Sequence, residues 1–129
     1  MTEPRWLSTV HILSIHADQI QAHGGSLGLR DRGLLESALD RPRNRFQDDP
    51  EADLSAIAAA CGFGLSSNHP FVDGNKRVAF QAMYLFLGLN GFRIDAPEED
   101  VVALILSLAS GDLDESSLAD WLRRHISPR

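Results

Sequence analysis

One segment of this 129-residue chain is apolar on nearly every side of a helix, and it constrains the fold more than any other feature. It runs from Asn75 or Lys76 to Leu89, and Asn90-Gly91 then provides a C-terminal stop. Its apolar side chains are Val78, Phe80, Met83, Leu85, Phe86 and Leu87. A helix with this composition has to be enclosed by other elements. The segment therefore predicts the central helix of a bundle.

Helical periodicity elsewhere supplies the surrounding elements. The predicted helices cover residues 6–22, a short stretch from Asp31 that Pro42 ends, residues 54–66, a stretch from Asp95 or Pro97 to Gly111, and a last helix capped by Asp114 that extends to Ile126. No alternating pattern of useful length predicts a strand, and no repeat or linker divides the chain. We therefore predict an all-α fold, a single domain over residues 1–129 with about six helices. Residues 43–49 lack a helical period and are predicted to form a short extended flap.

Several side chains are expected inside this bundle. The first helix should bury the residues that recur at helical spacing, namely Trp6, Val10, Leu13, Ala17 and Ile20. Cys61 is the only cysteine, and its alanine-rich surroundings favour a small buried helix position. His16 is expected to be a hydrogen-bonded helix residue near the core, because the histidines at 11, 16, 23 and 125 lack a known metal-ligand spacing.

The charge balance limits the classes of partner. A net charge of -6 and a pI near 5.2 argue against a general nucleic-acid or membrane-surface binder, which would carry a basic face. No apolar stretch approaches the ~20 residues that span a bilayer, and the first residues lack the layout of a signal peptide. We therefore expect a cytoplasmic protein whose partners are proteins and small molecules.

Between two predicted helices, the chain reads His69-Pro-Phe-Val-Asp-Gly-Asn-Lys-Arg77, the 69–77 loop. The first N–H groups of a helix are unpaired and bind anions, and Gly74 lets a phosphate approach the backbone closely. Asn75 can donate from its amide, while Lys76 and Arg77 add positive charge. These residues predict a cradle for a di- or triphosphate.

Asp73 and His69 have different predicted roles. A carboxylate among phosphate-binding groups would repel the ligand unless a cation lies between them, and Mg²⁺ binds one carboxylate together with substrate phosphates and waters. His69 is the one side chain of the loop that can accept a proton from a hydroxyl near neutral pH, so we predict a general base. The alternative is an ordinary interhelical turn, in which Asp73 caps the helix and the basic pair lies on the surface.

The 69–77 loop resembles the signature of the Fic family, H-P-F-x-D/E-G-N-G-R-x-x-R. Lys76 replaces the second glycine of the G-N-G element, and Phe80 stands in place of the final arginine. These departures are similar to the death-on-curing (Doc) branch of the family, toxins that act in toxin–antitoxin pairs. The segments Gly28–Leu39 and Phe86–Gly91 resemble the same branch, so the likeness covers most of residues 11–91.

The resemblance implies a helical Fic fold and an ATP-using transferase. Ordinary Fic proteins transfer AMP to a protein Ser, Thr or Tyr hydroxyl, whereas Doc-type proteins are kinases that inactivate elongation factor Tu and stop translation. Because Lys76 and the missing arginine alter the phosphate clamp, we favour the Mg-ATP-dependent kinase over the AMP-transferase. A catalytically silent helical binding module is a third hypothesis.

The same resemblance bears on control and on the target. It implies a flap that positions the target, for which Arg43, Arg45 and Phe46 are the candidate residues; the arginines could equally be solvent-exposed. Many Fic proteins carry an inhibitory helix whose glutamate reaches the final arginine. No convincing element of this kind occurs in the sequence, so we expect control by a separate, Phd-like antitoxin.

Overall fold

The computed structural model describes residues 2–129 and contains six helices and two short strands. The helices are α1 (Thr9–His23), α2 (Arg32–Asp48), α3 (Leu54–Asn68), α4 (Asn75–Leu89), α5 (Glu98–Ser110) and α6 (Glu115–His125). The strands are β1 (Phe92–Ile94) and β2 (Ile126–Pro128). The helical fold class predicted from the sequence is confirmed.

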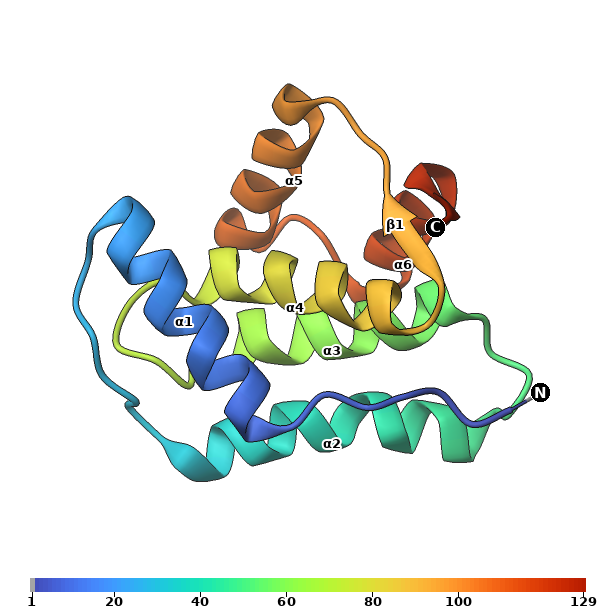
Figure 1. The fold of residues 1–129 in the computed structure, drawn as a ribbon, viewed down its shortest axis with the longest axis horizontal. Coiled ribbons are helices and arrows are strands. Elements are labelled where there is room, and N and C mark those ends of the chain that lie inside the picture. Colours follow the sequence, from blue (N-terminus) through green and yellow to red (C-terminus); the bar gives the residue numbers. More distant parts are fainter. Residues whose placement is uncertain (1) are drawn as a thin grey trace.

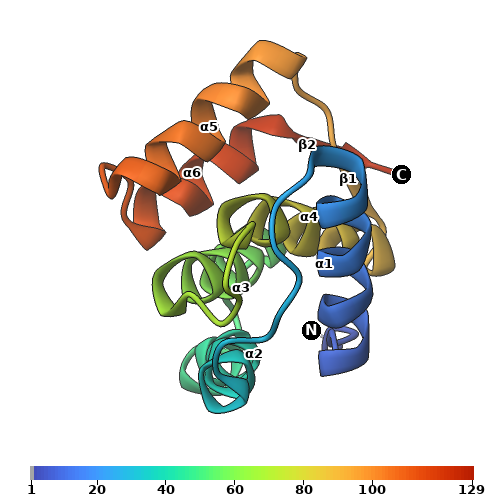
Figure 2. The same ribbon diagram turned by 90° about the vertical axis from the view of Figure 1, so that its left-hand side faces the viewer.

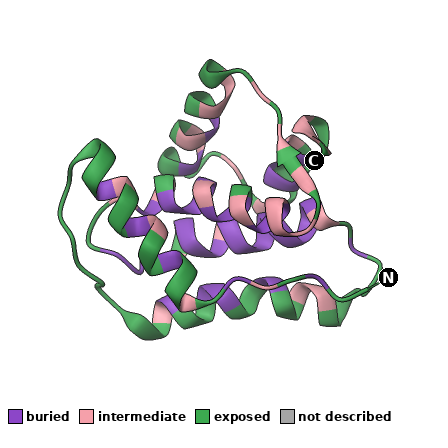
Figure 3. Cartoon of the chain, in the orientation of Figure 1, coloured by how far each residue is buried: buried purple, intermediate pink, exposed green. Residues whose placement is uncertain are grey.

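Two helices, α3 and α4, form the centre of the molecule. Figures 1 and 2 show them side by side, with α1 and α2 on one side and α5 and α6 on the other. Figure 3 shows burial concentrated on this pair, while the outer helices expose one face. The apolar segment 75–89 is thus enclosed, as predicted, but α3 is enclosed along even more of its length.

Small residues explain why α3 lies so deep. Its middle consists of Ala58, Ala59, Ala60, Cys61 and Gly62, all buried, so neighbouring helices can approach its backbone closely. Cys61 is 1% exposed, which confirms its predicted position, and burial raises the pKa of its thiol to about 12. This thiol therefore stays protonated near neutral pH.

Aspartate side chains cap the starts of α2, α3 and α6. The Asp31 side chain accepts from Leu34 N–H at 2.9 Å, and the Asp114 side chain accepts from Ser117 N–H at 2.7 Å, so both predicted caps are confirmed. Asp53 caps α3 in the same way, through Ala56 N–H at 2.9 Å.

The first helix was placed slightly wrongly. It begins at Thr9, and its buried residues are Ile12, His16 and Ile20, while Val10 is 72% exposed and Leu13 36%. Trp6 precedes the helix and packs in a half-buried position against Phe86, with ring centroids 6.1 Å apart. The error is a rotation of the buried face, because the sequence alone does not say which of two overlapping apolar stripes meets α4.

The prediction that Pro42 ends the second helix was also wrong. Helix α2 continues through Pro42 to Asp48, so residues 43–49 are helical up to the C-cap Asp49 and form no extended flap. Proline removes one N–H donor from a helix interior and normally kinks or ends it. Here Pro42 is buried against the core, and this packing favours a continued helix.

The small sheet was not predicted, because three residues are too short to show an alternating pattern. Strands β1 and β2 are antiparallel, with Phe92 opposite Pro128 and Ile94 opposite Ile126. Ile126, which was expected in the last helix, begins β2 instead. The sheet fixes the C-terminal end of the chain beside the end of α4. In the part of the chain described, no helix is both long and apolar enough to cross a bilayer.

Candidate active site

The 69–77 loop joins the two central helices at one end of the molecule, at the left in Figure 1. Helix α3 ends at Asn68, and His69 follows as its C-cap with φ 49, a left-handed conformation. Gly74 precedes α4 with φ 81 and makes no side-chain cap bond. The first N–H groups of α4 are therefore without a side-chain acceptor, which is the arrangement that binds an anion.

Buried contacts hold the loop in place. Phe71 is 1% exposed and anchors the loop in the core, and its backbone N–H and carbonyl both bond to the Asn75 side-chain amide at 2.9 Å. The His16 ring stacks on the Phe71 ring with centroids 3.9 Å apart, and His16 Nε2 lies 2.9 Å from the Asp73 carbonyl oxygen. The prediction of a buried, hydrogen-bonded His16 is confirmed, and its partner is the loop itself.

These contacts refine the predicted role of Asn75. Its amide was expected to donate to phosphate, yet its oxygen and one N–H are bonded to the backbone of Phe71. The group it presents at the helix start is its backbone N–H, so its side chain shapes the loop.

His69 and Lys76 lie together, with Lys76 Nζ 3.2 Å from each of the two ring nitrogens of His69. Although His69 is exposed as a residue, partial desolvation of its ring, together with the positive charges of Lys76 and Arg30, lowers the pKa of its imidazole. Burial likewise lowers the pKa of Lys76. The imidazole is solvent-exposed and held toward its neutral form, which is the form that accepts a proton.

A hollow of about 400 Å³ opens beside this pair. The α5–α6 connection forms its other wall and contributes Asp112 and Asp114, while α3 contributes Ser66 and Ser67. The hollow is thus lined by charged groups of both signs, with His69 and Lys76 on one wall and the two carboxylates on the α5–α6 connection.

Sequence reasoning missed Arg30 as a site residue. Its Nε donates to the His69 carbonyl at 2.7 Å, and its Nη2 donates to the Asn68 carbonyl at 2.9 Å. The only signal for it was its place in the Doc-like segment Gly28–Leu39, which specified no contact with the loop.

Asp73 faces the exposed 24–31 segment, which connects α1 to α2. One carboxylate oxygen accepts from Gly74 N–H at 2.9 Å, and the other lies 3.4 Å from the Ser26 nitrogen. Leu29 forms a β-bridge with Phe71. This segment, and not residues 43–49, is the extended chain next to the loop, as Figure 2 shows.

Arg77 lies on a different side of α4 from Lys76. It is exposed and lines a second hollow of about 420 Å³ between α1, α4 and α5, together with Phe80. The predicted phosphate ligands therefore flank the helix start on two sides. Phe80, which stands in place of the missing arginine, is an uncharged side chain that is 6% exposed.

The candidate residues of the predicted target-positioning flap lie near the C-terminal end of α2, opposite the loop in Figure 1; they are Arg43, Arg45 and Phe46. Phe46 packs on Trp6 with centroids 5.9 Å apart, and the Arg43 guanidinium lies 5.6 Å from the same ring. The structure does not bring these three side chains to the 69–77 loop.

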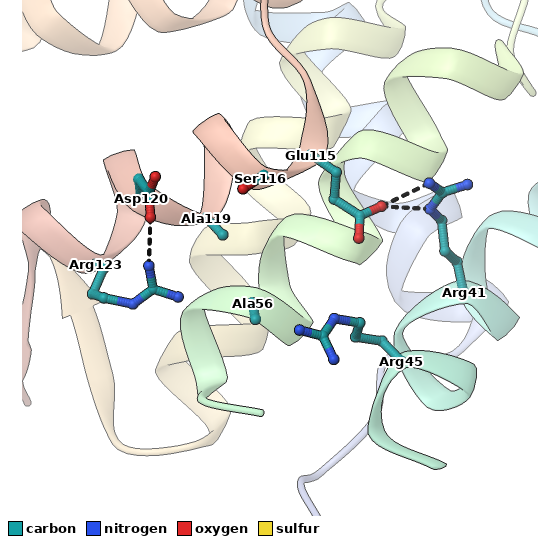
Figure 4. Close-up of a pocket in the computed structure, with 8 residues that line it drawn as sticks. All are labelled: Arg41, Arg45, Ala56, Glu115, Ser116, Ala119, Asp120 and Arg123. Carbon is teal, nitrogen blue, oxygen red and sulfur yellow. Dashed lines mark hydrogen bonds and ion pairs between the residues drawn. The ribbon is translucent and has the colours of Figure 1, made fainter. Parts of the chain in front are cut away.

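Arg45 lines a third hollow, between α2, α3 and α6 (Figure 4). Glu115 accepts from Arg41 at 2.7 Å, and Arg123 bonds to both Asp120 and Asp53. Arg45 lies 3.6 Å from Asp49. Each arginine of this hollow has a carboxylate partner, and the Arg41–Glu115 and Arg123–Asp53 pairs join different helices. The hollow therefore offers an anion little uncompensated positive charge.

Asp73 is the one carboxylate of the loop, and residues 2–129 hold no cluster of three or more His, Cys, Asp or Glu side chains suited to a metal. A lone exposed carboxylate fits Mg²⁺ that arrives with a nucleotide, because this ion takes most of its ligands from phosphates and waters. It does not fit a resident metal held by protein groups alone.

Comparison with known proteins agrees with this geometry. The profile of the Fic/DOC family matches residues 6–87. The chain is 33% identical over 121 residues to the protein kinase Doc of Escherichia phage P1, which covers 93% of this chain and 94% of the phage protein. It is 39% identical over 105 residues to the toxin Doc of Mycolicibacterium smegmatis, which covers 76% and 78% of the two chains.

The fold also resembles the N-terminal Fic domain of a VirB-translocated Bep effector protein from Bartonella quintana. The TM-score is 0.50 at 18% identity, over 74% of this chain and 47% of the other. The family profile and the two Doc relatives show that the chain belongs to the Fic/Doc family, as its 69–77 loop suggested.

Proposed function

We propose that this protein is a Doc-like toxin, a Mg-ATP-dependent protein kinase that phosphorylates a hydroxyl group of elongation factor Tu and so inhibits translation. The observation that carries the proposal is the placement of exposed His69 beside the uncapped N-terminus of α4, with the Lys76 ammonium 3.2 Å from its ring nitrogens. A relative named as a protein kinase, similar over nearly the whole chain, supports the choice of reaction.

The proposed roles follow from the loop geometry. The backbone N–H groups at the start of α4, with Lys76 on one side and Arg77 on the other, would bind nucleotide phosphates. Asp73 would hold Mg²⁺, which when bound neutralises charge on the phosphates. His69 would accept the proton of the target hydroxyl.

In the reaction itself, the target oxygen forms a bond to the γ-phosphorus while the bond from that phosphorus to the ADP oxygen breaks. The proton of the hydroxyl goes to a ring nitrogen of His69. Negative charge on the phosphoryl oxygens is stabilised by the helix start and the cations around it, which is the largest contribution expected for this chemistry.

Phosphoryl transfer is favoured over AMP transfer by Lys76 and Phe80. The Lys76 ammonium lies beside the base, where the AMP-transferring signature has glycine. Buried Phe80 leaves the second clamp position without a charge. Both changes act on the phosphate-binding end of the site, and they support a nucleotide orientation that exposes the γ-phosphate to the base.

Labelled ATP tests this proposal. Purified protein is incubated with elongation factor Tu and ATP labelled at the α or the γ phosphate, in parallel with the His69→Ala variant. The proposal predicts transfer of γ label only, and none with His69→Ala. Transfer of α label would establish the AMP-transferase instead, and no transfer of either label would favour the silent binding module.

We also propose that a Phd-like antitoxin controls the toxin. Expression of the chain alone should stop growth and translation, whereas co-expression with the product of a short adjacent reading frame should restore both. Growth arrest that no adjacent product relieves would contradict this partner.

A further inference from the structure

The geometry points to Arg30 as a positioning residue whose guanidinium fork, bonded to the carbonyls of Asn68 and His69, holds the base in its left-handed conformation. This inference rests on the proposed role of His69 as base. Arg30 lies outside the 69–77 loop, and its two hydrogen bonds explain why the residue at this position is an arginine.

The backbone of His69 needs such a restraint. Among residues 2–129, His69 is the only non-glycine residue with positive φ, at 49. This region is unfavourable for a residue with a Cβ and persists only when the surroundings impose it. Helix α3 ends here, so the carbonyls of its last turn also need donors from elsewhere.

Arg30 supplies those donors. Its Nε lies 2.7 Å from the His69 carbonyl and its Nη2 lies 2.9 Å from the Asn68 carbonyl, so one planar group grips two consecutive peptide units. Its backbone N–H bonds to the Pro70 carbonyl at 2.7 Å, which fixes the start of the side chain. Lysine cannot reproduce this fork, because its ammonium is a single point of charge.

The charge of Arg30 gives a second, separable readout. The charges that act on the His69 ring are those of Lys76 from α4 and Arg30 from the 24–31 segment, while Asp112 and Asp114 line the same hollow from the α5–α6 connection. Removing the guanidinium charge leaves one cation fewer near the ring, so the pKa of His69 should rise. A residue that merely stabilised the fold would not shift this pKa.

Three variants distinguish the effect of the two guanidinium hydrogen bonds from the effect of the positive charge. They are Arg30→Gln, Arg30→Lys and the control Arg32→Gln. Arg32 is of the same type two positions away, but it pairs with Glu36 on the surface. We expect the rate of transfer to fall roughly tenfold in both Arg30 variants, a loss typical for hydrogen bonds from a charged donor, and to stay unchanged in Arg32→Gln.

NMR provides a readout that needs no substrate, with His69→Ala used to assign the ring signals. The backbone chemical shifts of His69 should leave their left-handed values in both Arg30 variants. The pKa of His69 should rise in Arg30→Gln and stay low in Arg30→Lys. Because these measurements do not involve transfer, they stand even if the kinase proposal fails.

Arg30→Lys decides the matter if Arg30→Gln proves too unstable to study. Reduced transfer with an altered His69 backbone and an unshifted pKa supports the fork. Wild-type rate and wild-type backbone shifts in Arg30→Lys would overturn the inference, as would equal behaviour of Arg30→Gln and Arg32→Gln.

Discussion

Two segments at opposite ends of α2 differ in how they relate to the 69–77 loop. The 24–31 segment precedes the helix, runs extended, and donates hydrogen bonds from Arg30 and Asp31 N–H to the Pro70 carbonyl. Residues 43–49 belong to the far end of the helix, where Phe46 packs on Trp6 and Arg45 lines the hollow between α2, α3 and α6. Both carry arginine, yet only the first contributes a side chain to the candidate site.

A glycine explains why the 24–31 segment can lie so close to the 69–77 loop. Gly25 has φ 115, and a Cβ placed there would lie 2.5 Å from Asp73 Oδ2, so the backbone can lie against the carboxylate only because no side chain intervenes. Helices α2 and α3 also approach closely one turn before Pro42. A Cβ at Gly64 of α3 would lie 3.3 Å from the Ala38 carbonyl oxygen, the group that Pro42 leaves without its helical donor. Close packing of α3 on α2 at this turn helps the helix continue past proline.

The largest effect is expected at Gly25, where the 24–31 segment lies against Asp73. Gly25→Ala would push the 24–31 segment away from Asp73, and we expect roughly a hundredfold loss of transfer, the scale of a small misplacement in an active site. Gly24→Ala is the matched control, because Gly24 also has positive φ (79) but nothing lies within 4 Å of its added Cβ. Measured transfer rates that fall equally in both variants would show that backbone strain, and not the contact with Asp73, is responsible.

At the other end of α2, a substitution should lower the stability of the fold and leave the transfer rate unchanged. Phe46 is half-buried against Trp6, so Phe46→Ala should lower the free energy of unfolding by about 2 kcal/mol, somewhat less than for a fully buried phenylalanine. Urea unfolding measures this, and the rate per folded molecule should be unchanged. A loss of rate in Arg43→Ala or Arg45→Ala would restore these residues as target contacts.

The pH dependence of transfer should report the charges around the base. The pKa of His69 is lowered, so the acid limb of kcat/KM should have its midpoint below about 6.5, the ordinary value for histidine. Removing the neighbouring cation in Lys76→Gln should move this limb to higher pH by a fraction of a unit, whatever it does to nucleotide affinity. An acid limb that stays at the same pH in Lys76→Gln would show that the Lys76 charge does not lower the pKa of His69.

The smallest effect is expected from the ion pair at the start of α3. The side-chain bond from Arg123 lowers the pKa of Asp53, so the pair stabilises the fold above the unfolded pKa of Asp53 and loses this contribution as pH falls through the folded one. Both side chains are about half exposed, so Arg123→Ala should cost less than about 1 kcal/mol at pH 7. The difference in urea midpoint from wild type should shrink toward acid pH; a constant difference would point to lost packing.

Much of this architecture could be predicted from the sequence, because the caps Asp31 and Asp114 and the apolar segment 75–89 each act locally. The 69–77 loop was predicted for the same reason, since its residue types are consecutive. Pro42 was misread because packing in three dimensions outweighs its local preference. Arg30 was missed because its bonds to His69 and Asn68 join residues 39 and 38 positions apart, which no local pattern reveals.

Intact-mass spectrometry of elongation factor Tu, after incubation with the protein and Mg-ATP, distinguishes the proposed kinase from the alternatives. A kinase should add the mass of one phosphate group, and this gain should be absent with His69→Ala and retained with the distant variant Arg43→Ala. A mass gain of one AMP, or an unchanged mass alongside growth arrest that His69→Ala does not relieve, would contradict the kinase proposal.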